Sequence, residues 1–201
     1  MIKRLFDLSL SAVGLIASAP FWALFALAIK IEDGGAVFFP QARVGLGGRV
    51  FTALKFRSMV PDAESCGGPV QAGENDPRIT RVGRLLRGSA MDELPQLWNI
   101  LVGDMSFVGP RPLVPGEVEV RGDGRLIPLA EIPGYEARHG IRPGLTGLTQ
   151  VYAPRDLPRT SKFGLDRLYR ERAGVCLDLK LIALSFWITA RGSWESRGPK
   201  L

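Results

Sequence analysis

Cysteine and histidine are scarce in this chain of 201 residues. The two cysteines, Cys66 and Cys176, lie far apart and form no Cys-x-x-Cys pair, and His139 is the only histidine. Zinc sites need these residue types at short spacings, and disulfide scaffolds need several cysteines. The composition therefore excludes both, and it suits a reducing, cytoplasmic compartment.

Sequence motifs for nucleotide phosphates are also missing. The chain has neither a Gly-x-x-x-x-Gly-Lys-Ser/Thr loop nor a Gly-x-Gly-x-x-Gly turn behind a strand, and it has no internal repeat. A bound nucleotide would therefore depend on arginine side chains and a metal ion. Basic residues are in excess, with 26 Lys and Arg against 20 Asp and Glu. This excess suits nucleic acid, an anionic membrane surface or a phosphorylated substrate.

Residues 8–29 form an uncharged run of 22 residues. As a helix, this run is long enough to cross the ~30 Å hydrocarbon layer of a bilayer, and it is too long for a cleaved signal peptide. Pro20 lies near its middle, cannot donate to the carbonyl of Ile16, and therefore kinks a helix. Ser18 is placed to hydrogen-bond a backbone group that the kink frees.

Two arrangements of this run agree with the residues. One is a kinked transmembrane span, and the other is a helix–break–helix hairpin that enters and leaves the membrane by the same face. Basic residues tend to stay on the cytoplasmic side of a membrane. Lys3 and Arg4 precede the run, and Lys30 and Arg43 follow it, which favours the hairpin only slightly. The residues alone leave both arrangements open.

The rest of the chain predicts a mostly helical α+β domain. Residues 36–39 and 50–57 have the composition of short strands, and the glycines between them predict a turn that joins a small β-hairpin. Lys55 and Arg57 share one face at the end of the second strand. Their two positive charges indicate either a solvated strand face or a binding surface for an anion.

Further elements are expected toward the C-terminus. Residues 116–133 predict a surface connection with one short helix, and residues 163–172 predict a helix. A last helix is expected at 181–190, whose ten apolar residues are too few to span a membrane. It suits an amphipathic interfacial helix or, almost equally, a buried core helix.

The segment from Asp76 to Pro112 has the densest chemical pattern. Its adjacent acids, Asp92 and Glu93, are accompanied by Arg78, Arg81, Arg84, Arg87 and Arg111. After the acids, apolar residues recur at i, i+3, i+4 and i+7, namely Leu94, Leu97, Trp98 and Leu101. This spacing predicts an amphipathic helix with Asp92 as its N-cap and Gly103 as its stop.

Two interpretations of Asp92 and Glu93 follow from this placement. Acids at a helix N-terminus can simply be stabilised by the helix dipole, by roughly 0.3–1 kcal/mol. Arginines crowded beside such a terminus are instead typical of a polyanion site, most often a phosphate site. A carboxylate within that site can attack phosphorus and form a covalent acyl phosphate.

The same segment resembles the signature of the bacterial monotopic phosphoglycosyl transferases, which start glycoconjugate synthesis on a polyprenol carrier. The matching text is DPRITRVGRLLR followed by MDELPQLWNILVGDMSFVGPRP. The resemblance extends from KRLFDL near the start, through RPGLTGLTQV, to LDRLYRERAG and LDLKL. It covers nearly the whole chain. One departure is Ser18-Ala19-Pro20, where the family has adjacent Ser-Pro.

The resemblance implies transfer of a sugar-1-phosphate from a UDP-sugar to polyprenol (undecaprenyl) phosphate, with release of UMP. Asp92 is implied to be the nucleophile of a covalent aspartyl-phosphosugar intermediate, to bind Mg²⁺, and to act with Glu93. Substrate-binding roles are implied for Lys55, Arg57, Arg87, Arg111, Arg142 and Asp166.

The resemblance also implies an architecture. Residues 1–33 would form a re-entrant membrane helix broken at Ser18 and Pro20, and residues 34–201 a catalytic domain on the cytoplasmic face of the bacterial inner membrane. Membrane lipids are expected partners, a homo-oligomer is possible, and nucleic acid is not expected. The alternatives from other classes are a membrane-anchored scaffold without catalysis and a basic nucleic-acid-binding module, whose DNA affinity would fall steeply with salt.

Overall fold

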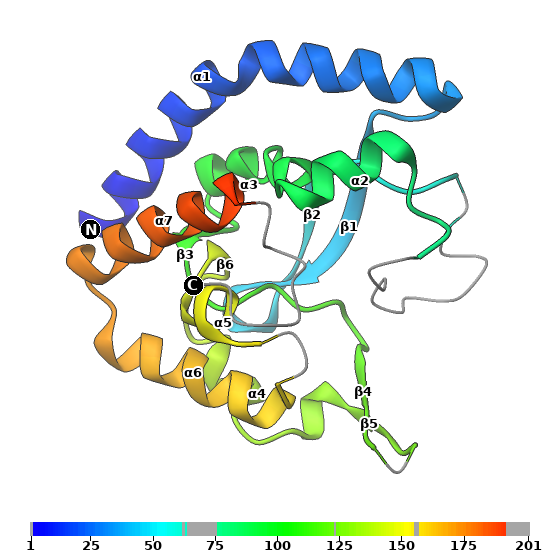
Figure 1. Ribbon diagram of the computed structural model, residues 1–201. Coiled ribbons are helices and arrows are strands. Elements are labelled where there is room, and N and C mark those ends of the chain that lie inside the picture. The colour runs from blue at the N-terminus through cyan, green and yellow to red at the C-terminus, as the bar shows by residue number, and fades with distance from the viewer. Residues whose placement is uncertain (1, 62, 64–75, 123, 155–156, 192–201) are drawn as a thin grey trace.

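The computed structural model describes residues 2–61, 63, 76–122, 124–154 and 157–191. A long N-terminal helix arches over a mostly helical α+β domain with small sheets (Figure 1). The helices are α1 (Ile2–Asp33), α2 (Arg81–Gly88), α3 (Gln96–Val102), α4 (Tyr135–Arg138), α5 (Leu148–Tyr152), α6 (Arg159–Arg172) and α7 (Val175–Ala190). The strands are β1 (Phe38–Val44), β2 (Val50–Phe56), β3 (Ser106–Val108), β4 (Val118–Val120), β5 (Leu126–Pro128) and β6 (Gly144–Thr146).

Helix α1 is continuous over 32 residues, with Pro20 inside it. A helix can continue through a proline at the loss of one hydrogen bond and with a bend, and α1 bends as it passes over the domain (Figure 1). The residues alone leave a kinked helix and a broken one open, and the family resemblance implies a break at Ser18 and Pro20; the structure has a single bent helix. The Ser18 hydroxyl donates to the carbonyl of Leu15 at 3.4 Å and accepts from the Trp22 indole at 3.1 Å. These neighbours, rather than the carbonyl of Ile16, use the hydroxyl.

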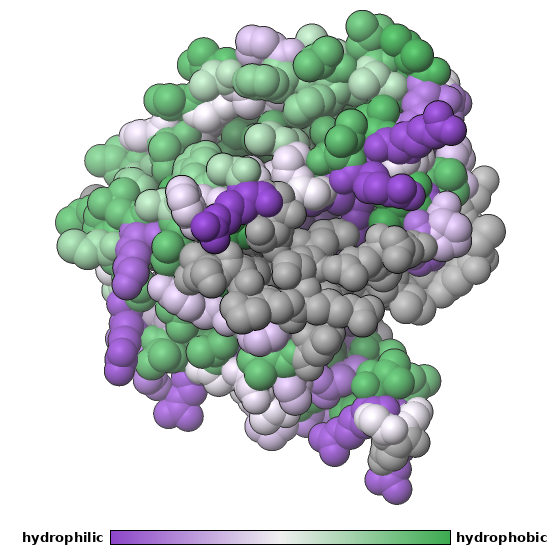
Figure 2. Space-filling model, viewed as in Figure 1, coloured by the Kyte–Doolittle hydropathy of each residue, from purple (hydrophilic) through white to green (hydrophobic). Residues whose placement is uncertain are grey.

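Both ends of α1 bind the same domain. Near its start, the Arg4 guanidinium donates to the carbonyl of Ile100 at 2.6 Å. At its end, the Glu32 carboxylate accepts from the backbone N–H of Arg81, at the start of α2, at 2.7 Å. The outer surface of α1 is largely hydrophobic (Figure 2), and by length and composition the helix is able to cross a membrane. Helix α1 thus combines an apolar outer face with polar attachments to one domain at both of its ends.

The predicted β-hairpin is confirmed, because β1 and β2 pair antiparallel along their whole lengths. Its turn contains Gly47 and Gly48, with φ angles of 64° and 76°, a region that residues with a Cβ rarely adopt. The first strand is longer than predicted. On β2, the Phe56 ring packs against the rings of Trp22 and Phe25 of α1, with centroids 5.5 and 5.7 Å apart. These contacts attach the second half of α1 to the hairpin.

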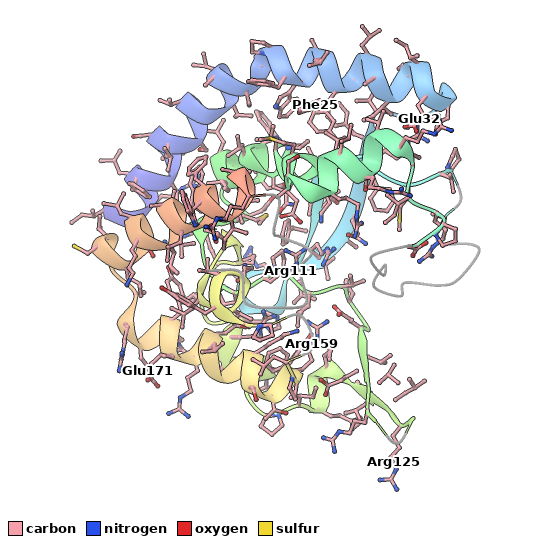
Figure 3. All side chains as sticks on the ribbon, in the orientation of Figure 1. Phe25, Glu32, Arg111, Arg125, Arg159 and Glu171 are labelled. Atoms are coloured by element: carbon pink, nitrogen blue, oxygen red, sulfur yellow. The ribbon has the colours of Figure 1, made fainter. Side chains whose placement is uncertain are left out.

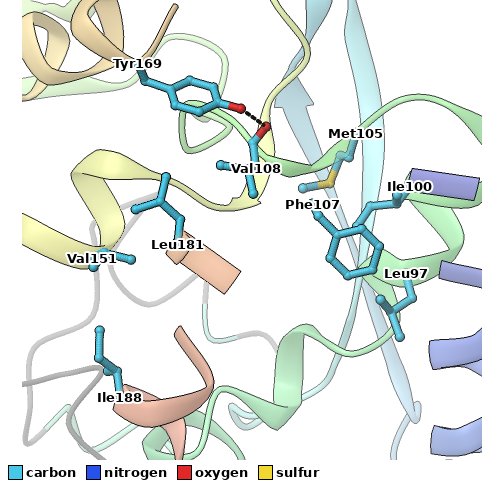
Figure 4. Packing of buried hydrophobic residues seen from close by; sticks show 9 residues of the cluster. All are labelled: Leu97, Ile100, Met105, Phe107, Val108, Val151, Tyr169, Leu181 and Ile188. Atoms are coloured by element: carbon cyan, nitrogen blue, oxygen red, sulfur yellow. Dashed lines mark hydrogen bonds between the residues drawn. The ribbon is translucent and has the colours of Figure 1, made fainter. Parts of the chain in front are cut away.

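The main core lies between α3, α7 and the parallel pair β3–β6. Its buried members are Leu97, Ile100, Met105, Phe107, Val108, Val151, Tyr169, Leu181 and Ile188 (Figure 4). The Tyr169 hydroxyl donates to the carbonyl of Val108 at 3.0 Å. Helix α7 begins six residues earlier than predicted. It buries Leu181 and Ile188 but leaves Trp187 half exposed, so it contributes both to the core and to an apolar surface.

Helix α3 ends at Gly103 as predicted, with a φ of 103°. Its buried face differs from the predicted stripe. Leu97 and Ile100 are buried, whereas Trp98 is 49% exposed. The helix is shorter than predicted, so the apolar repeat that starts at Leu94 does not describe one helical face.

Within residues 116–133, where the sequence predicts a surface connection with one short helix, the structure has a second hairpin that was not predicted. Strands β4 and β5 pair antiparallel around Gly124, whose φ is 81°, and a 3₁₀ turn, Leu129–Glu131, follows. Arg125 projects from the tip of this hairpin, far from Arg111 in the middle of the molecule (Figure 3).

Candidate active site

A cavity of about 1160 Å³ lies between α1 and the domain. One part of its wall is charged and includes Lys55, Arg87, Asp92, Glu93 and Arg111. Another part is apolar and comes from α1 and α7, with Leu10, Ala17, Phe21, Ile182 and Phe186 among its residues. The structure therefore brings these five predicted site residues, together with Arg57 and Asp166, into one cavity with the inner face of α1.

Asp92 and Glu93 lie in a 3₁₀ turn, Met91–Glu93. Ala90 precedes the turn with a φ of 55°, a conformation that costs a residue with a Cβ roughly 1–2 kcal/mol. The backbone N–H of Glu93 bonds to the carbonyl of Ala90 at 3.2 Å, and α3 begins only at Gln96. The prediction that Asp92 is the N-cap of the next helix is therefore wrong. Strain of this kind is concentrated at functional sites.

Glu93 is held by two cations. Its Oε1 accepts from the Lys55 ammonium at 2.8 Å and from the Arg111 guanidinium at 3.1 Å. Burial acts to raise the pKa of Glu93, but the charges of Lys55 and Arg111 outweigh it and hold that pKa well below its usual range. Burial lowers the pKa of Lys55, and the charge of Glu93 opposes that change. Glu93 is thus an anion that fixes one cation from β2 and one from the loop after β3.

Asp92 lacks the hydrogen bonds that Glu93 has. It is only 8% exposed, and no hydrogen bond reaches its carboxylate from the part of the chain that the structure describes. Burial raises the pKa of Asp92 to about 6, while the charge of Lys55 opposes the rise and that of Glu93 adds to it. Near neutral pH the group is mainly an ionised, desolvated carboxylate. That state suits a nucleophile.

Two further predicted substrate-binding residues, Arg57 and Arg142, have protein partners outside the acidic pair. Arg57 donates to the Asp33 carboxylate at 2.8 Å and so ties the end of α1 to the end of β2, although it also lines the cavity. Arg142 donates to the carbonyl of Gly103 at 2.9 Å and is not among the described residues that line the cavity. Contact of either residue with substrate stays a prediction.

Asp166, the third of these, lines the cavity but is buried, and its carboxylate is held by other side chains. It accepts from the Arg138 guanidinium at 2.9 Å and from the Thr149 hydroxyl at 2.6 Å. Arg138 in turn donates to the carbonyl of Arg111 at 2.7 Å, and Arg43 contacts the same loop. The sequence does not predict Arg43 or Arg138, because the fold brings them here from β1 and α4 and no local spacing links them to Arg111.

A magnesium site fits this arrangement only if substrate completes it. Among the described residues, no three Asp, Glu, His or Cys side chains lie together as a metal site. Mg²⁺ is commonly held by one or two carboxylates together with substrate phosphates and water. Asp92 suits that role because it faces the cavity without a hydrogen-bond partner in the described chain, whereas Glu93 already binds two cations.

The site thus combines a desolvated acid among cations with a cavity that adjoins a long apolar helix. A family model described as bacterial sugar transferase matches residues 1–192. The chain therefore belongs to this family and is an enzyme of the transferase class. Its family membership and apolar N-terminal helix indicate a membrane-associated protein.

Curated relatives cover most of the chain. It is 43% identical over 190 residues to an undecaprenyl-phosphate glucose phosphotransferase from Komagataeibacter xylinus. The match covers 91% of this chain and 35% of that protein. It is 40% identical over 187 residues to the exopolysaccharide production protein PSS from Rhizobium leguminosarum bv. phaseoli, with 90% and 92% covered. A UDP-glucose:undecaprenyl-phosphate glucose-1-phosphate transferase from Caulobacter vibrioides is 42% identical, with 90% and 66% covered. The chain thus spans about a third of the Komagataeibacter protein but nearly all of the Rhizobium protein.

Proposed function

We propose that this enzyme transfers a sugar-1-phosphate from a UDP-sugar to polyprenyl phosphate and releases UMP. The supporting observation is the two-part wall of the cavity. Its cations suit a diphosphate, and the apolar side chains of α1 and α7 suit an isoprenoid chain. The names of the Komagataeibacter and Caulobacter relatives, which refer to glucose transfer and undecaprenyl phosphate, support the same pair of substrates.

In the first step, a carboxylate oxygen of Asp92 attacks the phosphorus that bears the sugar. The bond between that phosphorus and the bridging oxygen breaks, and this oxygen leaves as part of UMP. Lys55, Arg87 and Arg111 lie around the acids and stabilise the charge that grows on the phosphoryl oxygens. The product is an aspartyl-phosphosugar enzyme.

In the second step, a phosphate oxygen of the polyprenyl phosphate attacks the same phosphorus. The bond to Asp92 breaks and restores its carboxylate, and polyprenyl-diphosphate-sugar is released. Glu93 is a poor proton acceptor, because Lys55 and Arg111 hold its pKa well below the usual range. Its role is to orient these two cations toward the phosphates.

Mg²⁺ belongs to the proposal as a cofactor shared with substrate. Asp92 would hold it together with the donor phosphates, and the ion would supply neutralisation of their negative charge. No other described carboxylate of the cavity is both beside the cations and without a partner.

The attachments of α1 support a re-entrant arrangement. A helix of 32 residues is about 48 Å long, so crossing the ~30 Å hydrocarbon layer would leave its two ends on opposite faces. Arg4 and Glu32 instead bind one domain. We therefore place that domain on the cytoplasmic face of the bacterial inner membrane, where soluble UDP-sugars and a lipid acceptor meet.

The test uses purified enzyme with Mg²⁺, UDP-glucose and undecaprenyl phosphate, and it measures UMP. With UDP-glucose alone, intact-protein mass spectrometry should show the added hexose phosphate, and this adduct should be absent from Asp92→Asn. Glu171→Gln on the exposed face of α6 is the matched control, and a panel of UDP-sugars identifies the preferred donor. Turnover without an adduct, or an adduct on Asp92→Asn, would contradict the covalent mechanism.

A further inference from the structure

The loop that carries Arg111 is fixed through its carbonyl groups. Pro110 and Pro112 have no N–H group, so the loop cannot be held by a regular series of its own donors. Four successive carbonyls instead accept from β6, α4 and β1. Pro110 accepts from the Gly144 N–H at 2.9 Å, Arg111 from Arg138 at 2.7 Å, Pro112 from Arg43 at 2.8 Å and Leu113 from the Val44 N–H at 2.8 Å.

Arg138 is the one of these donors that is itself held by a buried acid. It forms an ion pair with Asp166, and both side chains are only 3% exposed. The Arg138 guanidinium also lies 4.9 Å from the centroid of the Phe163 ring. One face of the guanidinium is thus packed, one nitrogen is paired with Asp166, and another donates to Arg111. A lysine could not reproduce this, because its ammonium is a point charge without the planar fork.

Each oxygen of Asp166 already accepts a hydrogen bond from another side chain of the protein. One oxygen accepts from Arg138 and the other from the hydroxyl of Thr149 at 2.6 Å. The chain of contacts runs from Asp166 to Arg138, to the backbone of Arg111, and through the Arg111 side chain to Glu93 at 3.1 Å.

We propose that Arg138 and Asp166 are positioning residues that act on the reaction through Arg111. Asp166 orients Arg138, and Arg138 holds the Arg111 backbone so that the Arg111 guanidinium stays directed at Glu93 and the donor phosphates. This inference rests on the proposed function. It reassigns Asp166 from a substrate contact to a support of the site.

A double-mutant cycle tests the inference, with UDP-glucose and undecaprenyl phosphate as substrates. In the wild-type background, Arg138→Lys should lower kcat by about 10- to 100-fold, as expected when a charge-stabilising group is displaced by an ångström or so, with little change in KM for UDP-glucose. In an Arg111→Met background the same change should lower kcat by less than about threefold, because it has no guanidinium left to displace. Arg167→Lys on the exposed face of α6 is the matched control.

Independent losses that multiply in the double variant would overturn the inference. If Arg138→Lys does not fold, Thr149→Val removes the hydroxyl that orients Asp166 without changing any charge, and Thr149→Ser keeps it. Thr149→Val should then lower kcat with Arg111 present and not in the Arg111→Met background, and equal losses in both would overturn the inference. Absence of UMP release by wild type would instead contradict the proposed function itself.

Discussion

Two regions of the molecule bury acidic side chains, and they differ in whether those side chains have hydrogen-bond partners. Near the start of α1, Asp7 is 1% exposed and accepts from the Phe107 backbone N–H at 3.1 Å. Asp178 on α7 is 2% exposed and accepts from Lys3 and from the Tyr169 hydroxyl at 2.7 Å. Burial and the Asp178 contact raise the pKa of Tyr169, so this hydroxyl keeps its proton. These acids join α1 to the domain.

At the cavity, Asp92 is nearly as buried but has no hydrogen-bond partner in the described chain. Its neighbour Glu93 forms ion pairs with Lys55 and Arg111, and Ala90, just before the turn that carries both acids, has a φ of 55°. The difference teaches that burial alone does not mark a reactive acid. The proposed nucleophile is instead a buried acid whose neighbour binds the cations, an arrangement that destabilises its charged state.

Replacing a buried aspartate by asparagine in each region tests this comparison, and the largest effect should come from the change at the cavity. Asp92→Asn should lower UMP release by about 10³-fold or more, since an amide is a poor nucleophile and covalent catalysis contributes at this scale. The variant should keep its fold, because no hydrogen bond in the described chain depends on the carboxylate. Product assays and thermal unfolding measure the two quantities. A large loss of stability would place Asp92 with the structural acids.

Asp178→Asn should show the opposite behaviour. Loss of the negative charge beside Lys3 should lower the free energy of unfolding by about 1–3 kcal/mol, below the value for a fully buried pair because Lys3 is 38% exposed. Folded protein should still form the adduct with UDP-glucose. Thermal unfolding in detergent, with the adduct yield per folded molecule, checks both points. An adduct lost in step with that of Asp92→Asn would break the comparison.

The charged part of the cavity could be predicted from the sequence, because its residues follow local patterns. Asp92 and Glu93 are adjacent, the arginines recur within one segment, and Lys55 ends a strand with period-two spacing. The hairpin β1–β2 follows from its strand composition and glycine turn. Each of these depends on residues close in sequence.

The rest depends on contacts between distant segments or on one unusual backbone angle. Asp7 bonds to a residue 100 positions away, and Arg138 to one 27 positions away, with no local pattern to link them. Ala90 takes a left-handed angle more typical of glycine, which displaced the predicted start of α3. The β4–β5 hairpin did have a signal, since Gly122-Asp123-Gly124 follows the alternating Val118-Glu119-Val120 and precedes the apolar Leu126-Ile127.

The pH dependence of Asp92 sharpens the comparison further. Its pKa rises from 3.8 to about 6 on folding, so between these values the folded chain keeps a proton that the unfolded chain has released. Stability should therefore fall as pH rises through this range, and Asp92→Asn should be more stable than wild type by about 3 kcal/mol at pH 8 and by less than about 1 kcal/mol at pH 4. Adduct formation from UDP-glucose alone should rise with pH and level off above about 6. A pH-independent rate would contradict the shifted pKa.

The smallest effect is expected at the apolar part of the cavity. Ala17→Trp should fill space assigned to the isoprenoid chain and raise KM for undecaprenyl phosphate by about 5- to 10-fold, or roughly 1 kcal/mol. The adduct with UDP-glucose alone should form at the wild-type rate, because that step needs no lipid. Ile16→Trp is the control, since Ile16 is 78% exposed and lies outside the described lining. Equal effects of both changes on the acceptor would show that the indole acts through the membrane rather than through the cavity, and would remove α1 from the acceptor site.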